Sequence, residues 1–342
     1  AKVAERSAET GEHYITRDWP QYRSMLRKAA GGGALTGGTT LLKFMIMGLG
    51  LSAFWGGFWA GAMYAASFVV IQLLHCTLAT KQPAMTAPAM AAKLKDIGQP
   101  EAVNAFVDEV AHLMRSQAAA VLGNVLVVFP VVLLLSVGIG LLLGHPMLSA
   151  KDAAYTLHSL SLLGPTLLFA GFTGCLLFAS SIIAGWVENW FVLRRLDSAM
   201  RYNPGITGIL GVERAGRWAH FMRNNISGFA SNISLGFMLG LIPPIMAFFS
   251  LPLEVRHVTL SAGQLAAASV AYGVQTVFMP AFWWAVAAIP LIGALNLGVS
   301  FYLAYKLALR AHNVSGVQRA HIHQAIWARW RHRPLNFFIP AG

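Results

Sequence analysis

The chain has 342 residues, of which 56% are hydrophobic and only 11% are charged, and its mean hydropathy is +0.58. A soluble globular domain carries about 25% charged residues, so this composition excludes an ordinary soluble enzyme and predicts an all-α, polytopic transmembrane bundle. The net charge of +12 does not require a nucleic-acid partner, because membrane proteins retain Lys and Arg in their cytoplasmic loops.

Six apolar runs are each long enough to cross about 30 Å of hydrocarbon as a helix. In chain order they cover 33–53, 55–78, 118–143, 160–187, 228–253 and a final region, 264–309. The final region has room for two crossings, or for one crossing and a half-helix, and Pro280 and Pro290 predict a break in it. We expect one net crossing there, which makes six spans.

Two segments outside these runs are expected to lie on a membrane surface or against a neighbouring helix. Val103, Phe106, Val107, Val110 and Met114 recur at the spacing of an amphipathic helix. The tail at 310–342 combines basic and aromatic residues, which is typical of a helix that rests on an anionic leaflet.

The positive charge predicts an orientation. Every Lys and Arg except Lys43, Lys151 and Arg256 falls in the N-terminal segment, two loops or the C-terminal tail, when Lys306 is counted with the tail. Lys and Arg concentrate on the cytoplasmic side, so these parts should all face the cytoplasm. We therefore expect a multi-pass protein of the bacterial inner membrane with both termini cytoplasmic. Its parts are a cytoplasmic N-terminal segment (1–30), a transmembrane hairpin (31–80), an amphipathic cytoplasmic region (81–117), a second hairpin (118–187), a basic cytoplasmic loop (188–227), a transmembrane region with a broken last segment (228–309) and a basic aromatic tail (310–342).

Lys43 is the strongest single candidate for function. It falls near the middle of the first predicted span, where a charge is costly unless it is paired, neutralised or hydrated. Either its ammonium holds backbone carbonyls, loses its proton, or meets an anionic substrate or a lipid phosphate, or the span is shifted and the side chain snorkels outward. None of the 13 acidic residues lies in a predicted span, and the closest is Glu188, so a proton relay built on carboxylates is not expected.

Small and amide side chains form a stripe in the fifth predicted span, where Gly228, Asn232, Gly236 and Gly240 recur every four residues. The favoured interpretation is a packing seam between helices, and the alternative is a groove in which Asn232 hydrogen-bonds a ligand. His75 and Asn296 are further polar candidates, more typical of contacts between helices than of ligand binding.

No motif in the chain predicts a metal or a cofactor. His321, His323 and His332 lack a Cys or carboxylate at ligand spacing, so we predict no metal site. Phosphate-loop, dinucleotide-binding and nucleophile-elbow motifs are also missing from the sequence.

The chain resembles a bacterial family described as site-specific recombinases. The resemblance extends over nearly the whole length and rests on LRKAAGGGALTGGTTLLKF, IQLLHCTLATKQPAMTAPAMA, WVENWFVLRRL, NISGFASNISLGFMLG and LPLEVRHVTLSAGQLA. It implies that this chain corresponds to the membrane-embedded C-terminal part of a longer protein with a helical N-terminal portion. The family description implies DNA strand exchange.

The residues themselves do not favour strand exchange. A tyrosine recombinase needs Arg, Lys, His and a Tyr nucleophile around one phosphate, and His220 with Arg223 imitates a fragment of that set. The nearest downstream tyrosines, Tyr272, Tyr302 and Tyr305, fall in the last hydrophobic region. We therefore interpret this HxxR pair as a chance feature of an arginine-rich loop.

Two functional hypotheses follow. The first is a transport, lipid-handling or membrane-scaffold protein that uses Lys43, the glycine stripe and cytoplasmic arginines on anionic headgroups, and that also binds protein partners or further copies of itself. The second is a membrane-associated DNA-binding or recombination protein, as the family description implies. The basic residues that either hypothesis places on phosphate are Arg194, Arg195, Arg214, Arg217, His220 and Arg223.

Overall fold

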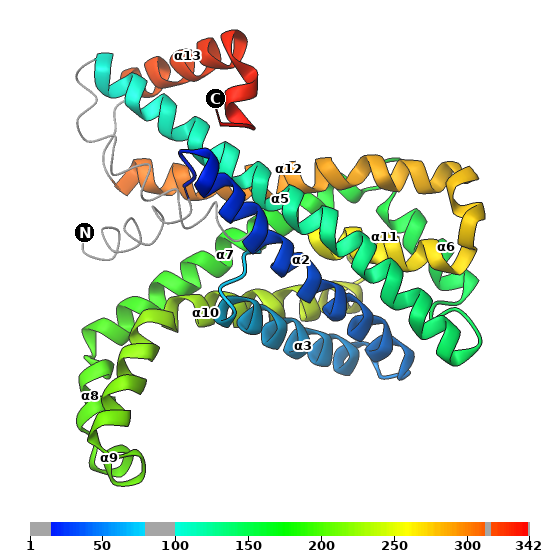
Figure 1. Ribbon diagram of the computed structural model, residues 1–342, viewed down its shortest axis with the longest axis horizontal. Coiled ribbons are helices and arrows are strands. Elements are labelled where there is room, and N and C mark those ends of the chain that lie inside the picture. The colour runs from blue at the N-terminus through cyan, green and yellow to red at the C-terminus, as the bar shows by residue number, and fades with distance from the viewer. Residues whose placement is uncertain (1–14, 79–99, 312–315, 341–342) are drawn as a thin grey trace.

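The computed structural model describes residues 15–78, 100–311 and 316–340, and every regular element in these ranges is a helix (Figure 1). The predicted all-α class is confirmed. The α-helices are α2 (Trp19–Gly48), α3 (Ala53–Leu73), α5 (Pro100–Leu143), α6 (Ala150–Leu160), α7 (Thr166–Leu193), α8 (Leu196–Tyr202), α9 (Pro204–Leu210), α10 (Val212–Phe248), α11 (Val258–Tyr272), α12 (Pro280–Ala311) and α13 (Gly316–His332). Two short 3₁₀ helices, η3 (Gly273–Phe278) and η4 (Pro334–Phe337), complete the set.

Five of the described helices, α3, α5, α7, α10 and α12, are long and apolar enough to cross a membrane. The helix α2, which we predicted as the first span, has 30 residues but is not among the five. It contains several Gly and Thr residues, which lower its hydropathy, and it joins α3 through a tight turn at Gly50 (φ 63°). The count of six spans stays a prediction.

Polar caps set several helix starts, as the sequence pattern favours. The Asp18 carboxylate accepts a hydrogen bond from the Gln21 backbone N–H at 2.8 Å at the start of α2. The Ser149 hydroxyl accepts one from the Asp152 N–H at 3.1 Å at the start of α6. Each cap satisfies an N–H that the first turn of a helix cannot pair.

Three helices do not begin where the expected segments begin. The amphipathic segment at 100–117 and the third span at 118–143 are one helix, α5, because no helix-breaking residue separates them. The fourth span, expected at 160–187, begins instead at Thr166, after a break that ends α6 at Leu160. The fifth, expected at 228–253, is the inner part of α10, which starts at Val212.

The last hydrophobic region is broken before Pro280 and not at Pro290. After α10 the chain runs without regular structure through 249–257, and α11 then forms with almost all of its side chains buried. Gly273 (φ 56°) begins η3, which leads into α12, and Pro290 lies within α12 without ending it. In Figure 1, α11 starts inside the bundle and ends at the margin where η3 lies.

The bundle has two distinct ends in Figure 1. The α2–α3 turn, the α5–α6 turn and η3 lie at the right-hand end. The outer parts of α7 and α10, with α8, α9, α13 and the last turns of α12, lie at the left-hand end. The predicted cytoplasmic segments that the structure describes therefore gather at one end.

Five apolar clusters lie among the described helices, and three of them hold most of the buried side chains. The largest joins α5, α6, α11 and α12, and the second joins α3, α7 and α10. The third, smaller cluster packs the first half of α5 against α13 and η4, through buried Phe106, Ile322 and Phe337. An ion pair between Arg329 and Asp108 at 2.6 Å holds α13 on α5 there.

Candidate functional site

The basic segment between α7 and α10 forms a helical arm, which we define as residues 186–227. Figure 1 shows α7 and α10 continuing out of the bundle at the lower left, where α8 and α9 connect them. The arm exposes large apolar side chains together with its arginines; Trp186, Tyr202 and Val212 are each more than 60% exposed. A surface that mixes Arg with exposed aromatic and apolar groups is typical of a binding surface.

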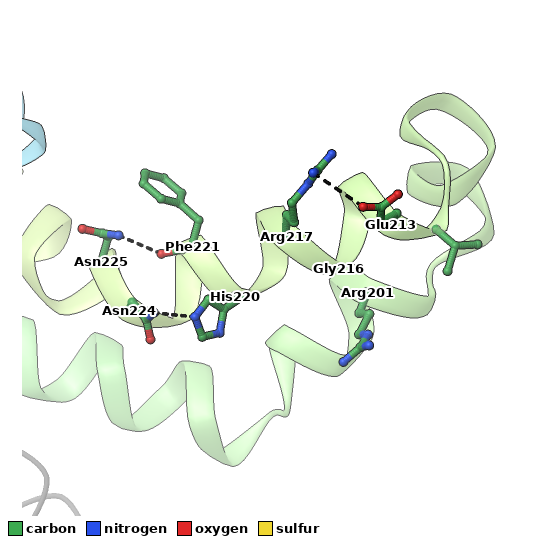
Figure 2. Close-up of a pocket in the computed structure, with 9 residues that line it drawn as sticks. Arg201, Glu213, Gly216, Arg217, His220, Phe221, Asn224 and Asn225 are labelled. Atoms are coloured by element: carbon green, nitrogen blue, oxygen red, sulfur yellow. Dashed lines mark hydrogen bonds and ion pairs between the residues drawn. The ribbon is translucent and has the colours of Figure 1, made fainter.

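A pocket of about 840 Å³ opens on the arm (Figure 2). Four of its residues, Glu213, Arg217, His220 and Asn224, follow one another at helical spacing and therefore share one face of α10. Arg201 reaches the pocket from α8. The complete lining is Arg201, Val212, Glu213, Gly216, Arg217, His220, Phe221, Asn224 and Asn225.

The pocket offers more hydrogen-bond donors than acceptors. Arg217 contacts Glu213 at 3.6 Å, but both side chains are largely exposed, so this pair is weak. His220 and Asn224 are joined by a hydrogen bond of 3.0 Å between a ring nitrogen and the amide nitrogen (Figure 2). The Arg201 guanidinium stacks beside Tyr202, with 5.5 Å from Cζ to the ring centroid. Two guanidinium groups are therefore free to bind an anion at this pocket.

Arg223 has a different role, because it fastens α8 to α10. Its guanidinium forms an ion pair with the Asp197 carboxylate at the start of α8. Burial raises the pKa of Asp197, but hydrogen bonds from the Ser198 backbone and from Arg223 outweigh this and hold the pKa below its usual 3.8. This ion pair holds in place the helix that carries Arg201.

The remaining predicted arginines lie on the arm but outside the pocket. Arg194 follows the last residue of α7, and Arg195 adopts a left-handed conformation (φ 48°) where the chain turns into α8. Arg214 is exposed on α10 and is absent from the pocket lining. Glu188 lies half-buried in the outer part of α7.

The described tyrosines do not assemble a recombinase site. Tyr272 donates a hydrogen bond to the Ala150 carbonyl at 3.0 Å, at the end of the bundle opposite the arm. Tyr305 stacks on Phe106 and Phe301 in the smaller core cluster. Tyr302 lies beside Lys306 on α12. Tyr202 is the one tyrosine of the arm, which also carries His220 and Arg223. It precedes His220 in the chain, so a search for a nucleophile downstream of His220 overlooks it. The Arg223 guanidinium is turned to Asp197.

A chain of amides joins the inner end of the pocket to the bundle. The Gln72 amide, in the last turn of α3, donates to the Asn225 side-chain oxygen at 3.2 Å. The buried Asn232 amide donates to the Gln72 side-chain oxygen at 2.6 Å and to the Phe68 carbonyl at 3.1 Å. Asn232 therefore lies between α3 and α10, where both of its donated hydrogen bonds go to α3.

The glycine stripe lies against α3. A Cβ atom on Gly236 would come within 2.3 Å of the Ala65 backbone nitrogen, and one on Gly240 within 2.3 Å of the Gly61 nitrogen. At Gly228 it would meet the Gln72 amide at 2.4 Å. At Gly236 and Gly240 the neighbouring atoms are backbone, so only glycine fits, whereas the Gln72 side chain beside Gly228 can move aside. The two backbone approaches give the stripe the geometry of a close helix-packing seam.

Buried polar groups around Arg256 form a second centre, of which the sequence singled out only Asn296. Asn296, fully buried on α12, donates to the Ala170 and Arg256 carbonyls and accepts from the Val258 N–H at the start of α11. The Arg256 side chain is only 8% exposed and binds the Ser159 carbonyl and the Glu254 carboxylate. The sequence LEVRHV is typical of an ordinary polar loop. Its role in this buried polar centre becomes apparent only from its burial in the structure.

Lys43 and His75 lie in different surroundings. Lys43 is half-buried in the last two turns of α2, within the electrostatic reach of Arg256 and Glu254. His75 falls beyond the end of α3, in a left-handed turn (φ 54°), and its side chain is exposed. The helix ends at Leu73, five residues before the predicted end of the second span, so His75 lies outside this helix.

No group of His, Cys, Asp and Glu residues in the described ranges has the arrangement of a metal site. A family model described as "Site-specific recombinase" matches residues 1–340 of the chain. Comparison with curated proteins and with solved structures found no match.

Proposed function

The chain belongs to the site-specific recombinase family, and we propose that it is a multi-pass membrane protein that binds the phosphate groups of anionic lipids in the pocket of its arm. The observation that carries this proposal is the pocket itself: Arg201 and Arg217 face it, and apolar Val212 and Phe221 lie beside them. Phosphate beside a glycerol and acyl chain presents the same combination of charge and apolar surface.

The surface of the bundle supports a membrane location. Leu141 and Leu142 are at least 80% exposed, and so are Phe248 and Phe278. Apolar side chains this large and this exposed suit hydrocarbon better than water. Together with the five long apolar helices, they favour a bundle embedded in lipid.

Charge supports the proposed orientation. The arm and α13 carry most of the described Arg residues and lie at the same end of the bundle. Lys and Arg concentrate on the cytoplasmic side of membrane proteins, where the leaflet is anionic. We therefore place the arm in the cytoplasm of a bacterium, next to the inner leaflet of its inner membrane.

The depth of the pocket suits a lipid headgroup. Its innermost residue, Asn225, is hydrogen-bonded to Gln72 in the last turn of α3, which is one of the five long apolar helices. The pocket therefore begins where α3 leaves the bundle and continues outward to Arg217. A headgroup at the membrane surface would meet it from the inner end.

DNA binding is the second candidate, and only the family description favours it. Duplex binding gains affinity from many phosphate contacts, whereas the pocket offers two free guanidinium groups. Arg223 is already paired, and Glu213 adds negative charge at the rim. Strand exchange would also need a Tyr nucleophile beside these residues, and the cation that contacts Tyr202 among the described residues is Arg201.

Native mass spectrometry of the purified protein tests the proposal. The protein in detergent is titrated with short-chain phosphatidylglycerol, and binding is compared for the wild type and the double variant Arg201→Gln/Arg217→Gln. Each charge-assisted hydrogen bond contributes about 1.5–3 kcal/mol, so we expect the double variant to bind at least tenfold more weakly.

Arg214→Gln is the matched control, because it removes the same charge from the same helix outside the pocket. Equal phosphatidylglycerol binding by the double variant and the control would overturn the proposal. Steep, salt-dependent binding of a DNA duplex that is lost only in the double variant would establish the second candidate instead.

A further inference from the structure

The C-terminal part of the chain presents apolar and basic side chains together on its exposed side. Four large apolar side chains that are 42–69% exposed and two exposed arginines make up this side: Trp327, Leu335, Phe338, Ile339, Arg331 and Arg333. The Arg331 guanidinium lies over the Trp327 ring, with 5.2 Å from Cζ to the centroid. Trp330 connects α13 to the residues after η4, because its ring contacts that of Phe338 at 5.8 Å. We call the six residues the tail surface.

The tail surface is held in place from behind. On the opposite side of α13 and η4, Ile322 and Phe337 are buried in the smaller apolar cluster against α5. The Arg329–Asp108 ion pair adds a polar contact between α13 and α5. Arg115 of α5 donates to the Asn336 carbonyl of η4 at 2.7 Å. The exposed side chains therefore stand on a packed platform.

The smaller cluster also sets the depth of α13 relative to the apolar helices. Phe301 and Tyr305 of α12 belong to this cluster, and their rings stack at 5.5 Å. Both lie in the last two turns of Pro280–Leu307, the part of α12 that is long and apolar enough to cross a membrane. Because Ile326 and Trp330 of α13 pack in the same cluster, α13 lies at the level where this apolar stretch ends.

The side chains of α12 at this level have the character of a membrane interface. Tyr302 is 58% exposed, and the ammonium of exposed Lys306 lies 5.7 Å from the centroid of its ring. Tyr and Trp are enriched at headgroup depth, and Lys and Arg there extend their charged ends toward water. The Trp327 ring with the Arg331 guanidinium over it is a second pair of the same kind.

The charge of the tail complements an anionic leaflet. Residues 310–342 carry five arginines and no acidic residue. Arg329 is paired with Asp108, whereas Arg331 and Arg333 are exposed and have no carboxylate partner within the residues that the structure describes. Basic groups at headgroup depth attract anionic lipids, and exposed apolar side chains beside them favour a bilayer over a water-soluble anion.

We propose that the tail surface is an interfacial anchor, whose apolar side chains insert between lipid headgroups while Arg331 and Arg333 bind the phosphates of anionic lipids. This anchor goes beyond the proposed function and rests on it only for the membrane location, because it shares no residue with the pocket of the arm. In Figure 1, α13 and the arm lie on opposite sides of the left-hand end of the bundle. The protein therefore holds one leaflet at two separate places.

Dyes at single cysteines test the anchor in the whole protein. In a Cys76→Ser/Cys175→Ser background, Trp327→Cys or Leu335→Cys carries an environment-sensitive dye, and the protein is placed in phosphatidylcholine nanodiscs with or without phosphatidylglycerol. We expect blue-shifted emission at both positions and quenching by nitroxides at headgroup depth, which increases with phosphatidylglycerol. His321→Cys is the matched control, because position 321 is exposed on the same helix but turned about 120° from Trp327, and its dye should stay unquenched.

A charge variant separates the role of the arginines from that of the apolar side chains. Arg331→Gln/Arg333→Gln with the dye at position 335 should lose the increase that phosphatidylglycerol causes. Arg214→Gln on the arm removes one charge elsewhere and should keep it. Equal quenching with and without phosphatidylglycerol in the unmodified tail would overturn phosphate binding by the two arginines, and with it the proposal.

A dye at Leu134→Cys distinguishes failure of the anchor from failure of the membrane location. Leu134 is 69% exposed within the apolar part of α5, so nitroxides deep in the acyl chains should quench a dye there. Unquenched dyes at 327 and 335 beside a quenched dye at 134 would overturn the anchor alone and leave this surface to a protein partner. Unquenched dyes at all three positions would overturn the membrane location as well.

Discussion

Arg217 on the arm and Arg256 in the bundle show how surroundings decide what an arginine does. The Arg217 side chain is 70% exposed and has one weak partner, Glu213. The Arg256 side chain is 8% exposed and is saturated by two backbone carbonyls and Glu254. The first is free to exchange water for a ligand, whereas the second is part of the framework. Arginine-rich sequence therefore does not locate the binding site. The arginines whose hydrogen-bond donors lack fixed partners do.

Removing Arg256 should have the largest effect on stability. Arg256→Met removes the donor from the Ser159 and Val255 carbonyls and from the Glu254 carboxylate, and each such loss costs about 1–3 kcal/mol. We expect a large fall in the unfolding temperature of the detergent-solubilised protein. Size-exclusion chromatography after heating measures this temperature. Arg217→Met should change stability by less than about 0.5 kcal/mol, and equal losses in both variants would break the contrast between the two regions.

The seam between α3 and α10 should show an intermediate effect. In Gly236→Ala the new Cβ would meet the Ala65 backbone at 2.3 Å, and overpacking of this kind costs about 1–3 kcal/mol. Gly185→Ala on α7 is the control, because its Cβ would have no neighbour within 4 Å. Thermal unfolding of the two variants measures the difference, and a Gly236→Ala protein as stable as the control would contradict the close approach.

The Asp197–Arg223 pair predicts a small effect of pH that is confined to the arm. Because the folded pKa of Asp197 lies below the unfolded value of 3.8, the pair contributes fully above that pH and loses its contribution as the pH falls further. Both side chains are partly exposed, so screening limits the effect to about 1 kcal/mol or less. Hydrogen exchange of α8, corrected for the intrinsic rate, should rise at low pH in the wild type. If an Asp197→Asn protein showed the same pH dependence, the Asp197–Arg223 pair would not be its cause.

The sequence predicted the fold class, the apolar helices and the break in the last region, because hydropathy and Pro–Gly patterns are local. It missed the continuity of α5 because polarity changes at Gln117 without any residue that would end a helix. It also placed Arg256 in an external loop, since the partner that buries it is the Ser159 carbonyl, and a backbone group has no signature in the side-chain sequence.

The candidate site was predicted in part. Arg217 was singled out from the basic loop, and it lines the pocket. Arg201 was not, because its position depends on the ion pair between Asp197 and Arg223, which joins residues 26 apart in the chain. Arg194, Arg195 and Arg214 have the same composition signal as Arg217 but lie outside the pocket. Ion pairs between residues far apart in the chain therefore decide which arginines line the pocket and which do not.

Photo-crosslinking from the pocket tests the central claim most directly. A photoreactive phenylalanine analogue replaces Val212 in the pocket or Ile209, which is 86% exposed nearby and does not line it. The protein is irradiated in phosphatidylcholine nanodiscs with or without phosphatidylglycerol, and adducts are identified by mass. We predict a phosphatidylglycerol adduct at position 212 that greatly exceeds the one at position 209. Equal adducts at the two positions, or none at 212, would contradict lipid binding by the arm.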